Sequence, residues 1–237
     1  MKPISAAPKM MIGNGMLRKK IPMNATAAIA TIAPGVQSQG VWAGRRQLFV
    51  RFAAEAETAI LYTAEMLAKQ LQRVTAQSPL HSISLSGRDP LASAGLIAAT
   101  FAQWRSPLPV MLDCDGQRPD AVAEVASGVT LIQVTFEFGD APALAERALA
   151  TLAAAARSTR DHAAVLAPRN GTSDGQILRF IEQAHAAAPG TKIVVHPAPG
   201  IERAPLERRY ATLLEQAMQI HRDVELVMRI PSPVGVR

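Results

Sequence analysis

From about residue 25 the chain alternates short apolar segments with longer amphipathic ones, and this alternation restricts the fold more than any other feature. Short segments rich in Val, Ile and Leu predict strands, whereas apolar residues spaced three and four positions apart predict helices. Strands that alternate with helices form parallel sheets, because each helix carries the chain back to the start of the next strand. We therefore predict an α/β fold built on a parallel sheet.

The expected elements amount to about six βα units. The expected strands are residues 26–33, 47–54, 81–86, 109–113, 129–137, 162–167, 191–196 and 223–230. The expected helices are residues 63–76, 91–104, 141–157, 173–187 and 204–221. Six units are too few for a closed eight-unit barrel, so we predict an open, partial (βα)6 barrel. No repeat or shift in composition divides residues 25–237, which we expect to form a single domain.

The basic character of the chain is concentrated at its N-terminus. The net charge is +6, and five positive charges with no acid fall in residues 1–24, which leaves about +1 for the remainder. That segment has no sustained periodicity, so we predict a disordered basic tail, and Met23 is an alternative start site. A tail that carries the charge argues against a nucleic-acid-binding face on the fold itself.

Cysteine content and hydropathy set further limits. The single cysteine, Cys114, excludes an intramolecular disulfide and a multi-cysteine metal site. Its neighbours Asp113 and Asp115 would raise its pKa, so we expect an unreactive thiol. No run of 18 or more apolar residues predicts a membrane-spanning helix. A cytoplasmic protein without membrane association is the resulting prediction.

Residues 37–63, QSQGVWAGRRQLFVRFAAEAETAILYT, resemble the opening of radical S-adenosylmethionine (SAM) enzymes of the 7-carboxy-7-deazaguanine synthase type. Those enzymes begin with a Q-G-E-G-like turn and an A-G-R-R-x-x-F-V-R-F-A-G strand, followed by a C-x-x-x-C-x-x-C motif that holds a [4Fe–4S] cluster. Here the cysteine positions are Glu55, Ala59 and Tyr62. Such a cluster requires thiolates, so the resemblance implies a radical SAM-type partial barrel without the cluster and without radical chemistry.

The SAM-binding strand also departs from the family pattern. HSISLSGRDPL resembles the strand that ends in T-G-G-E-P-L and holds the amino group of SAM in the family. Ser86 and Gly87 match, whereas Arg88 replaces the second glycine and Asp89 replaces the glutamate. An arginine would place a cation beside the SAM ammonium group, so we predict that SAM is not a cofactor.

The resemblance extends over nearly all of residues 25–237. VMLDCDGQRPDAV is similar to the family's L-E-T-N-G-T-x-P-D-A segment, with Asp113 and Asp115 in place of its glutamate and asparagine. LIQVTFEFGD places Thr135 and Glu137 on the family's aspartate and lysine, and VELVMRIPSPVGV places Arg229 on a glutamine. Framework positions are retained while polar functional positions have changed, which favours an old fold adapted to another role.

Several charged residues are candidates for a site at the ends of the expected strands. Asp89, Asp113 and Asp115, with Glu55 and Glu137 nearby, could form a carboxylate cluster for Mg²⁺; the alternative is turn-capping and solvated acids. Arginines suit an anionic small molecule or an acidic partner, or else they form salt bridges to these acids. The arginines concerned are Arg45, Arg46, Arg51, Arg88, Arg169 and Arg229.

Among the histidines, only His196 lies at the carboxyl end of an expected strand, where α/β folds bind ligands. His196 is therefore a candidate for a binding role. Arg51 matches a framework position of the family, so we expect a structural salt bridge from it.

Three functional hypotheses follow. The first is a non-catalytic relative, a pseudoenzyme, that acts as a binding or scaffold component for a partner protein or a metabolite. The resemblance implies a pterin or deazapurine cofactor pathway, such as tetrahydromethanopterin synthesis, and a homodimer. The second is a non-radical enzyme that uses the acids and arginines, with Mg²⁺, on an anionic heterocycle. The third is nucleic-acid binding through the basic tail.

Overall fold

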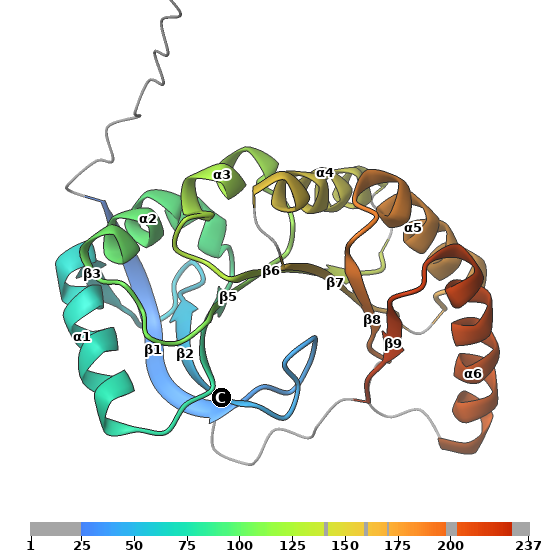
Figure 1. Ribbon diagram of the computed structural model, residues 1–237, viewed down its shortest axis with the longest axis horizontal. Helices are drawn as coiled ribbons and strands as arrows, with labels where there is room; N and C mark the ends of the chain where they lie inside the picture. The colour runs from blue at the N-terminus through green and yellow to red at the C-terminus, as the bar shows by residue number, and fades with distance from the viewer. Residues whose placement is uncertain (1–24, 140–141, 159–160, 170, 198–202, 229–237) are drawn as a thin grey trace, which may run out of the picture.

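The computed structural model describes residues 25–139, 142–158, 161–169, 171–197 and 203–228 (Figure 1). The predicted tail at residues 1–24 and the candidate Arg229 lie outside the described residues. The described strands form one sheet in the order β3-β1-β2-β4-β5-β6-β7-β8-β9. The strands are β1 Thr26–Val36, β2 Arg46–Phe52, β3 Ile60–Thr63, β4 Ser82–Gly87, β5 Val110–Cys114, β6 Leu131–Glu137, β7 Asp161–Ala167, β8 Lys192–Val195 and β9 Val224–Leu226.

The sheet is parallel from β2 through β9, as the strand–helix alternation predicts. The two strands beyond β2 are antiparallel, since β1 pairs with β2 and with β3 in that sense. The predicted parallel sheet is therefore confirmed from β2 onward, whereas the strand expected at residues 26–33 is antiparallel to it. Only residues 37–45 join β1 to β2, and a parallel pair needs a crossover of a dozen residues or more. β3 was not predicted.

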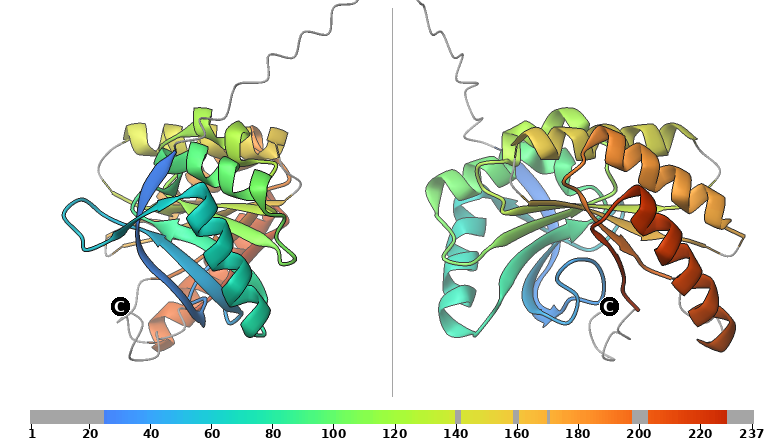
Figure 2. Two further views of the ribbon diagram at one scale, coloured as in Figure 1. Left: turned by 90° about the vertical axis from the view of Figure 1, so that its left-hand side faces the viewer. Right: turned by 45° about the vertical axis from the view of Figure 1, so that its right-hand side comes forward.

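The helices lie on the convex side of the curved sheet (Figures 1 and 2). They are α1 Ala64–Gln77, α2 Ala94–Gln103, α3 Val122–Val125, α4 Pro142–Ser158, α5 Asp174–Ala187 and α6 Arg203–Ile220, with short 3-10 turns η1 Pro90–Ser93 and η2 Pro119–Ala121. The connection through η2 and α3 was not predicted. It completes a sixth βα unit in the described chain, and the described strands leave the sheet open between β3 and β9.

The main core lies between the sheet and these helices. The outward residues of neighbouring strands, such as Leu112, Val134 and Leu166, are fully buried in it together with Leu71 and Ile177 from the helices. Each fully buried aliphatic side chain stabilises the fold by about 1.5–3 kcal/mol. The convex face of the sheet therefore supplies most of the buried apolar contact, and the concave face holds polar side chains and a smaller apolar cluster.

Candidate functional site

A cavity of about 820 Å³ opens on the concave side, at the carboxyl ends of β4, β5 and β6. Carboxyl ends of parallel strands are where open α/β sheets bind ligands. Its lining residues are Gln37, Gln39, Phe49, Ser86, Gly87, Asp113, Cys114, Asp115, Gln117, Thr135, Phe136, Glu137, Gly139, Leu144 and Arg169. Five residues predicted from the sequence to be site candidates are thus brought together here: Ser86, Asp113, Asp115, Glu137 and Arg169.

The alternation of side chains along each strand places these polar groups on one face. On β6, Gln133, Thr135 and Glu137 share the concave face, while Val134 and Phe136 between them pack in the core with the helices. Successive residues of a strand point to opposite sides of the sheet. A polar–apolar alternation therefore builds a polar concave surface over an apolar layer.

The loop of residues 37–45 folds back across the concave face, where it is the blue loop in Figure 1. The Val41 N–H donates to Oε1 of Gln133 at 3.1 Å, and Val41 and Trp42 pack on a small apolar cluster that includes Met111. At Gly40, φ is +75°, and a Cβ atom there would lie 2.1 Å from Oε1 of Gln133. Only glycine lets the loop approach this closely.

This loop brings amide side chains to the site from the amino-terminal side of the sheet. Gln37 is buried, and both Gln37 and Gln39 line the cavity. The Gln37 N–H donates to the Arg45 carbonyl at 2.9 Å, and the Gly44 N–H donates to the Gln37 carbonyl at 2.8 Å. These backbone hydrogen bonds hold the base of the loop closed, so the two glutamines are fixed relative to the strands.

Asp113 is the inner carboxylate of the cavity. The Thr135 hydroxyl donates to Oδ1 of Asp113 at 2.7 Å. Burial raises the pKa of the Asp113 carboxyl, because the charged form loses hydration. The Thr135 hydrogen bond lowers this pKa in part, and the neighbouring amide side chains of Gln133 and Gln39 act in the same direction. The site therefore holds an oriented carboxylate that favours an additional hydrogen-bond donor or positive charge.

An ion pair between Glu137 and Arg169 lies at the rim of the cavity. The Arg169 backbone N–H donates to the Thr172 hydroxyl at 3.0 Å. Among the described residues that line the cavity, Arg169 is the only positively charged one, against the three carboxyl groups of Asp113, Asp115 and Glu137. With all of these groups ionised, the lining carries a net charge of −2.

Asp115 is exposed and also lines the cavity. Its Oδ1 atom accepts the Gln117 N–H at 3.1 Å, the local turn that aspartate commonly forms with the chain two residues on. Asp115 therefore shapes the turn after β5 and contributes negative charge near the cavity mouth.

Two of the remaining sequence candidates have structural roles. The Arg51 guanidinium donates to Oε2 of Glu57 at 3.1 Å, and that carboxylate also accepts the Ala54 N–H at 3.0 Å. The salt bridge expected for Arg51 is thus confirmed, and the Arg51 hydrogen bond is the main cause that lowers the pKa of Glu57. Asp89 caps η1 through the Ala92 N–H and accepts from Arg118 at 2.6 Å.

Arg88 and His196 do not line the described cavity. Arg88 is exposed at the end of β4, where its N–H donates to the Phe52 carbonyl. Gly87 before it has φ +118°, and a Cβ there would lie 2.3 Å from the Phe52 oxygen. His196 is buried, with Nδ1 2.8 Å from the Val227 carbonyl, so it joins the ends of β8 and β9.

Cys114 faces the core and is buried, although it also borders the cavity. Burial raises the pKa of the thiol, and the negative charge of Asp113 adds to this effect. A thiol held in its neutral form is a weak nucleophile, in agreement with the unreactive cysteine predicted from the sequence.

The three positions that the resemblance aligns with cluster cysteines lie outside the described cavity lining. Glu55 is exposed and Ala59 is half-buried, both in the connection between β2 and β3. Tyr62 belongs to β3, pairs with Ala27 of β1 and packs against the core. The segment in which the resemblance predicts the degenerate cluster motif therefore comprises part of the β2–β3 connection and the edge strand β3.

The carboxylate cluster proposed for Mg²⁺ is wrong within the described part of the chain. No three His, Cys, Asp or Glu side chains there lie close enough together to hold a metal ion. Each acid has its own partner, since Asp89 binds Arg118, Asp113 binds Thr135 and Glu137 binds Arg169. The alternative of turn-capping and solvated acids describes Asp89, which caps η1, and the exposed Glu137.

Sequence reasoning did not select several lining residues as site candidates, notably Gln37, Gln39, Phe49 and Gln117. The signal for the first two was present in the QSQG turn, which was used only to identify the resemblance. Its folding across the sheet depends on a contact between Val41 and Gln133, 92 positions apart, and no local pattern reports such a contact.

Comparison of the sequence with protein-family models and with curated proteins found no match. None of the described helices is both long and apolar enough to cross a membrane. The function is therefore argued from the chemistry of the cavity.

Proposed function

We propose that the protein is a cluster-less relative of radical SAM enzymes that binds a planar heterocycle with N–H donors, of the pterin or deazapurine class. In this proposal it is a binding component of a cofactor pathway and performs no radical chemistry. The observation that carries the proposal is the half-buried Asp113 carboxylate, oriented by the Thr135 hydroxyl at the inner end of a cavity large enough for a small molecule.

The chemistry of Asp113 fits an N–H-rich ring edge. An ionised carboxylate accepts hydrogen bonds on both oxygens and has about four acceptor sites. Thr135 occupies one of them directly. A 2-aminopyrimidinone edge, found in pterins and deazaguanines, presents adjacent N–H donors that a carboxylate can accept together. Gln39 adds an amide donor and acceptor at the same cavity, and Phe49 provides an apolar surface for a ring.

The charge of the cavity supports the same ligand class. A net charge of −2 among its lining residues repels a ligand whose inner end is anionic, and it favours one that donates hydrogen bonds there. The alternative of a magnesium-dependent enzyme has less support, because the described acids are separately paired.

The test is a titration with pterin, followed by its intrinsic fluorescence, on anaerobically purified protein with parallel iron and sulfide analysis. We expect Asp113→Asn to weaken pterin binding by roughly tenfold to a hundredfold, the range for one hydrogen bond to a charged group. Asp120→Asn is the matched control, because Asp120 is exposed on η2 and outside the cavity lining.

Two results would contradict this proposal. One is the absence of pterin or deazapurine binding to folded wild-type protein. The other is stoichiometric iron with SAM cleavage, which would mean that a cluster forms despite the replacement of the cysteines at residues 55, 59 and 62. Equal weakening of pterin binding by Asp113→Asn and Asp120→Asn would mean that Asp113 does not contact the ligand.

A further inference from the structure

We propose that His185 and His221 form a binding site for a divalent transition-metal ion, with Cu²⁺ bound most tightly, at the edge of the sheet opposite the cavity. His185 lies in the last turn of α5, and His221 directly follows α6. Their Nδ1 atoms are 3.0 Å apart. His221 contacts Thr191, which directly precedes β8, so the pair lies at the amino ends of the strands. The inference is therefore independent of the function proposed for the cavity.

The ring of His221 is oriented in the way that is common for a metal-binding histidine. His221 is buried, and its Nε2 is 2.6 Å from the Thr191 carbonyl oxygen. Because a carbonyl oxygen only accepts, Nε2 carries the ring hydrogen, and Nδ1 of the neutral imidazole keeps its lone pair. Histidines that bind metals commonly donate their other ring N–H to a backbone carbonyl, which fixes the tautomer and the direction of the ring. His221 thus presents an acceptor nitrogen to His185.

The groups that hold the His221 ring are themselves fixed by the backbone. Thr191 is fully buried, and its N–H and its hydroxyl both donate to the Ala188 carbonyl, at 3.0 and 2.8 Å. The His221 N–H donates to the Ala217 carbonyl at 2.8 Å and so continues the hydrogen bonding of α6 by one residue. The main chain of His221 and the far side of its ring are therefore both held, and Nδ1 stays directed toward His185.

His185 supplies the second nitrogen and is accessible to an ion from solvent. It is exposed, and its ring meets that of His221 edge to face, with the centroids 5.2 Å apart. Without a metal, the Nδ1–H of His185 donates to Nδ1 of His221. When an ion binds, this hydrogen moves to Nε2 of His185, where water accepts it, and rotation of the exposed ring directs both Nδ1 lone pairs at the ion.

The separation of the two nitrogens indicates which ions fit. Two nitrogens that each lie about 2.0–2.1 Å from one ion are about 2.9 Å apart at a right angle and about 3.4 Å apart at the tetrahedral angle. The observed 3.0 Å is close to the first value. Right-angled positions occur in the tetragonal sites that Cu²⁺ and Ni²⁺ form with nitrogen and oxygen ligands, and Cu²⁺ binds most tightly among the divalent first-row ions. Mg²⁺ prefers oxygen ligands.

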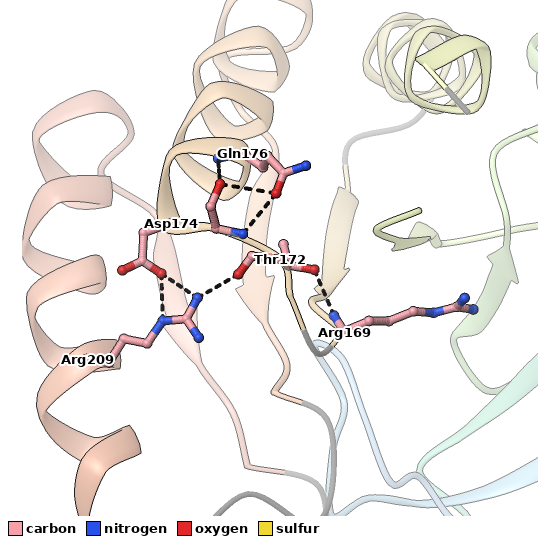
Figure 3. Close-up of polar contacts among 6 residues, drawn as sticks. Arg169, Thr172, Asp174, Gln176 and Arg209 are labelled. Carbon is pink, nitrogen blue, oxygen red and sulfur yellow. Dashed lines mark hydrogen bonds and ion pairs between the residues drawn. The ribbon is translucent and has the colours of Figure 1, made fainter. Parts of the chain in front are cut away.

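The two helices that lead to the histidines are also joined near the start of α5 (Figure 3). Nε of Arg209 on α6 donates to Oδ1 of Asp174 at 2.8 Å, and a terminal nitrogen of Arg209 donates to the Thr172 carbonyl at 2.8 Å. Asp174 precedes His185 by 11 residues. Arg209 precedes His221 by 12 residues. At the helical rise these separations are about 17 and 18 Å, so the link at Arg209 brings the two histidines to the same level.

The protein supplies only two ligands to this site. In the part of the chain that the structure describes, no group of three His, Cys, Asp or Glu side chains could hold a metal ion. Water would then fill the remaining coordination positions. Structural metal sites are closed by protein ligands, so we expect this open site to bind its ion reversibly and to release it to a chelator.

The experiment titrates tag-free, full-length protein with Cu²⁺ and follows binding by calorimetry and by electron paramagnetic resonance. We expect one saturable Cu²⁺ site per chain, with hyperfine coupling to two imidazole nitrogens. Loss of a group that only orients a metal ligand typically lowers affinity tenfold to a hundredfold, so removal of a ligand in His185→Gln should lower it at least about tenfold. Ni²⁺ and Zn²⁺ should compete more weakly than Cu²⁺, and Mg²⁺ should not compete.

His185→Gln is the preferred variant, because His185 is exposed and its replacement leaves the core intact. His81→Gln is the matched control, since His81 is half-buried and hydrogen-bonds to Ser82, away from both helices. Only the fold brings the paired histidines together, because they are 36 positions apart in the sequence. Cu²⁺ should therefore raise the Tm of wild-type protein and of His81→Gln more than that of His185→Gln.

Equal Cu²⁺ affinity and an equal rise in Tm for wild-type protein and His185→Gln would overturn the proposal. Equal loss of affinity in His185→Gln and His81→Gln would overturn it too, because the ion would then not be held by the pair specifically. Pterin affinity should be unchanged in His185→Gln. Failure of the metal site is thus distinguishable from failure of the function proposed for the cavity.

Discussion

At the scale of single residues, the ionised Asp113 carboxylate is expected to lower the stability of the folded protein while it supports ligand binding. A carboxyl group whose pKa is raised by burial disfavours ionisation in the folded state. The unfolded chain ionises near the ordinary value of about 3.9, so the folded protein binds more protons above that pH. Stability is then lost as the pH rises from the unfolded pKa through the folded pKa, and the full cost is present above both.

We predict that Asp113→Asn stabilises the folded protein at pH 8 while it weakens ligand binding. Asparagine keeps the shape and the acceptor for the Thr135 hydroxyl but has no charge to desolvate. The gain is of the order of 1 kcal/mol, which corresponds to a rise in Tm of roughly 2–4 °C for a domain of this size. Thermal unfolding of both proteins at pH 8 and pH 4 measures it.

The difference in Tm should become smaller at pH 4, because there Asp113 is protonated in the folded state and about half protonated in the unfolded state. Asp120→Asn should show no such pH-dependent gain, since Asp120 is exposed. A lower Tm for Asp113→Asn at pH 8 would mean that the ionised carboxylate stabilises this cavity through its hydrogen bonds.

At the scale of elements, the loop of residues 37–45 determines whether the cavity forms. Its approach to β6 depends on Gly40 at φ +75° beside the Gln133 amide. We predict that Gly40→Ala destabilises the protein by about 1–2 kcal/mol for the backbone conformation and by a further amount for displacing Gln133. It should also weaken pterin binding, because Gln39 precedes the shifted residue.

Gly171 offers the matched control for that prediction. Its φ is +89°, yet a Cβ atom there would meet no atom within 4 Å. Gly171→Ala therefore reports the backbone cost alone, and chemical denaturation of both variants separates the two contributions. Equal losses of unfolding free energy would show that the contact between Gly40 and Gln133 does not constrain the loop.

The sequence predicted those elements that have local or periodic signals. Helix α5 begins at the capping box of Ser173, and predicted residues 173–187 correspond closely to Asp174–Ala187. β3 has no such signal, because the strand is only four residues long and its residues Ile60 and Leu61 are both exposed. The closing strand was predicted at residues 223–230, whereas β9 is described only over Val224–Leu226.

The residues of the candidate site also fall into those that the sequence predicted and those that it did not. Asp113, Asp115 and Glu137 were predicted because parallel strands bring their carboxyl ends to one edge, and Ser86 because of the resemblance to a SAM-binding strand. Gln37 and Gln39 reach that edge only through the folded-back loop, a tertiary contact that sequence spacing does not encode. The hydrogen-bond partners of Arg209 could not be predicted either, because nothing near Arg209 in the sequence identifies Thr172 and Asp174.

At the scale of the whole molecule, the two faces of the sheet differ in their roles in stability and in binding. The convex face buries apolar residues under the helices, and the concave face holds the polar groups of the cavity. Substitutions on the concave face can therefore change binding while the main core remains intact.

The distribution of charge along the chain leads to the last prediction. A variant that starts at Met23 removes the five positive charges of residues 1–22 and changes the net charge from +6 to +1. Affinity for a polyanion depends on the number of neutralised charges and falls steeply with salt. We predict that full-length protein is retained on heparin in a salt-dependent manner and that the shortened variant is not retained at 0.15 M, a physiological ionic strength.

The shortened variant should keep the wild-type Tm and pterin affinity, because β1 begins at Thr26 and the cavity lining begins at Gln37. Retention of the variant on heparin with an unchanged salt dependence would locate a polyanion-binding surface on the fold itself. Loss of retention together with unchanged pterin binding would show that the basic segment and the cavity act independently. In that case polyanion binding could be removed without affecting the function proposed for the concave face.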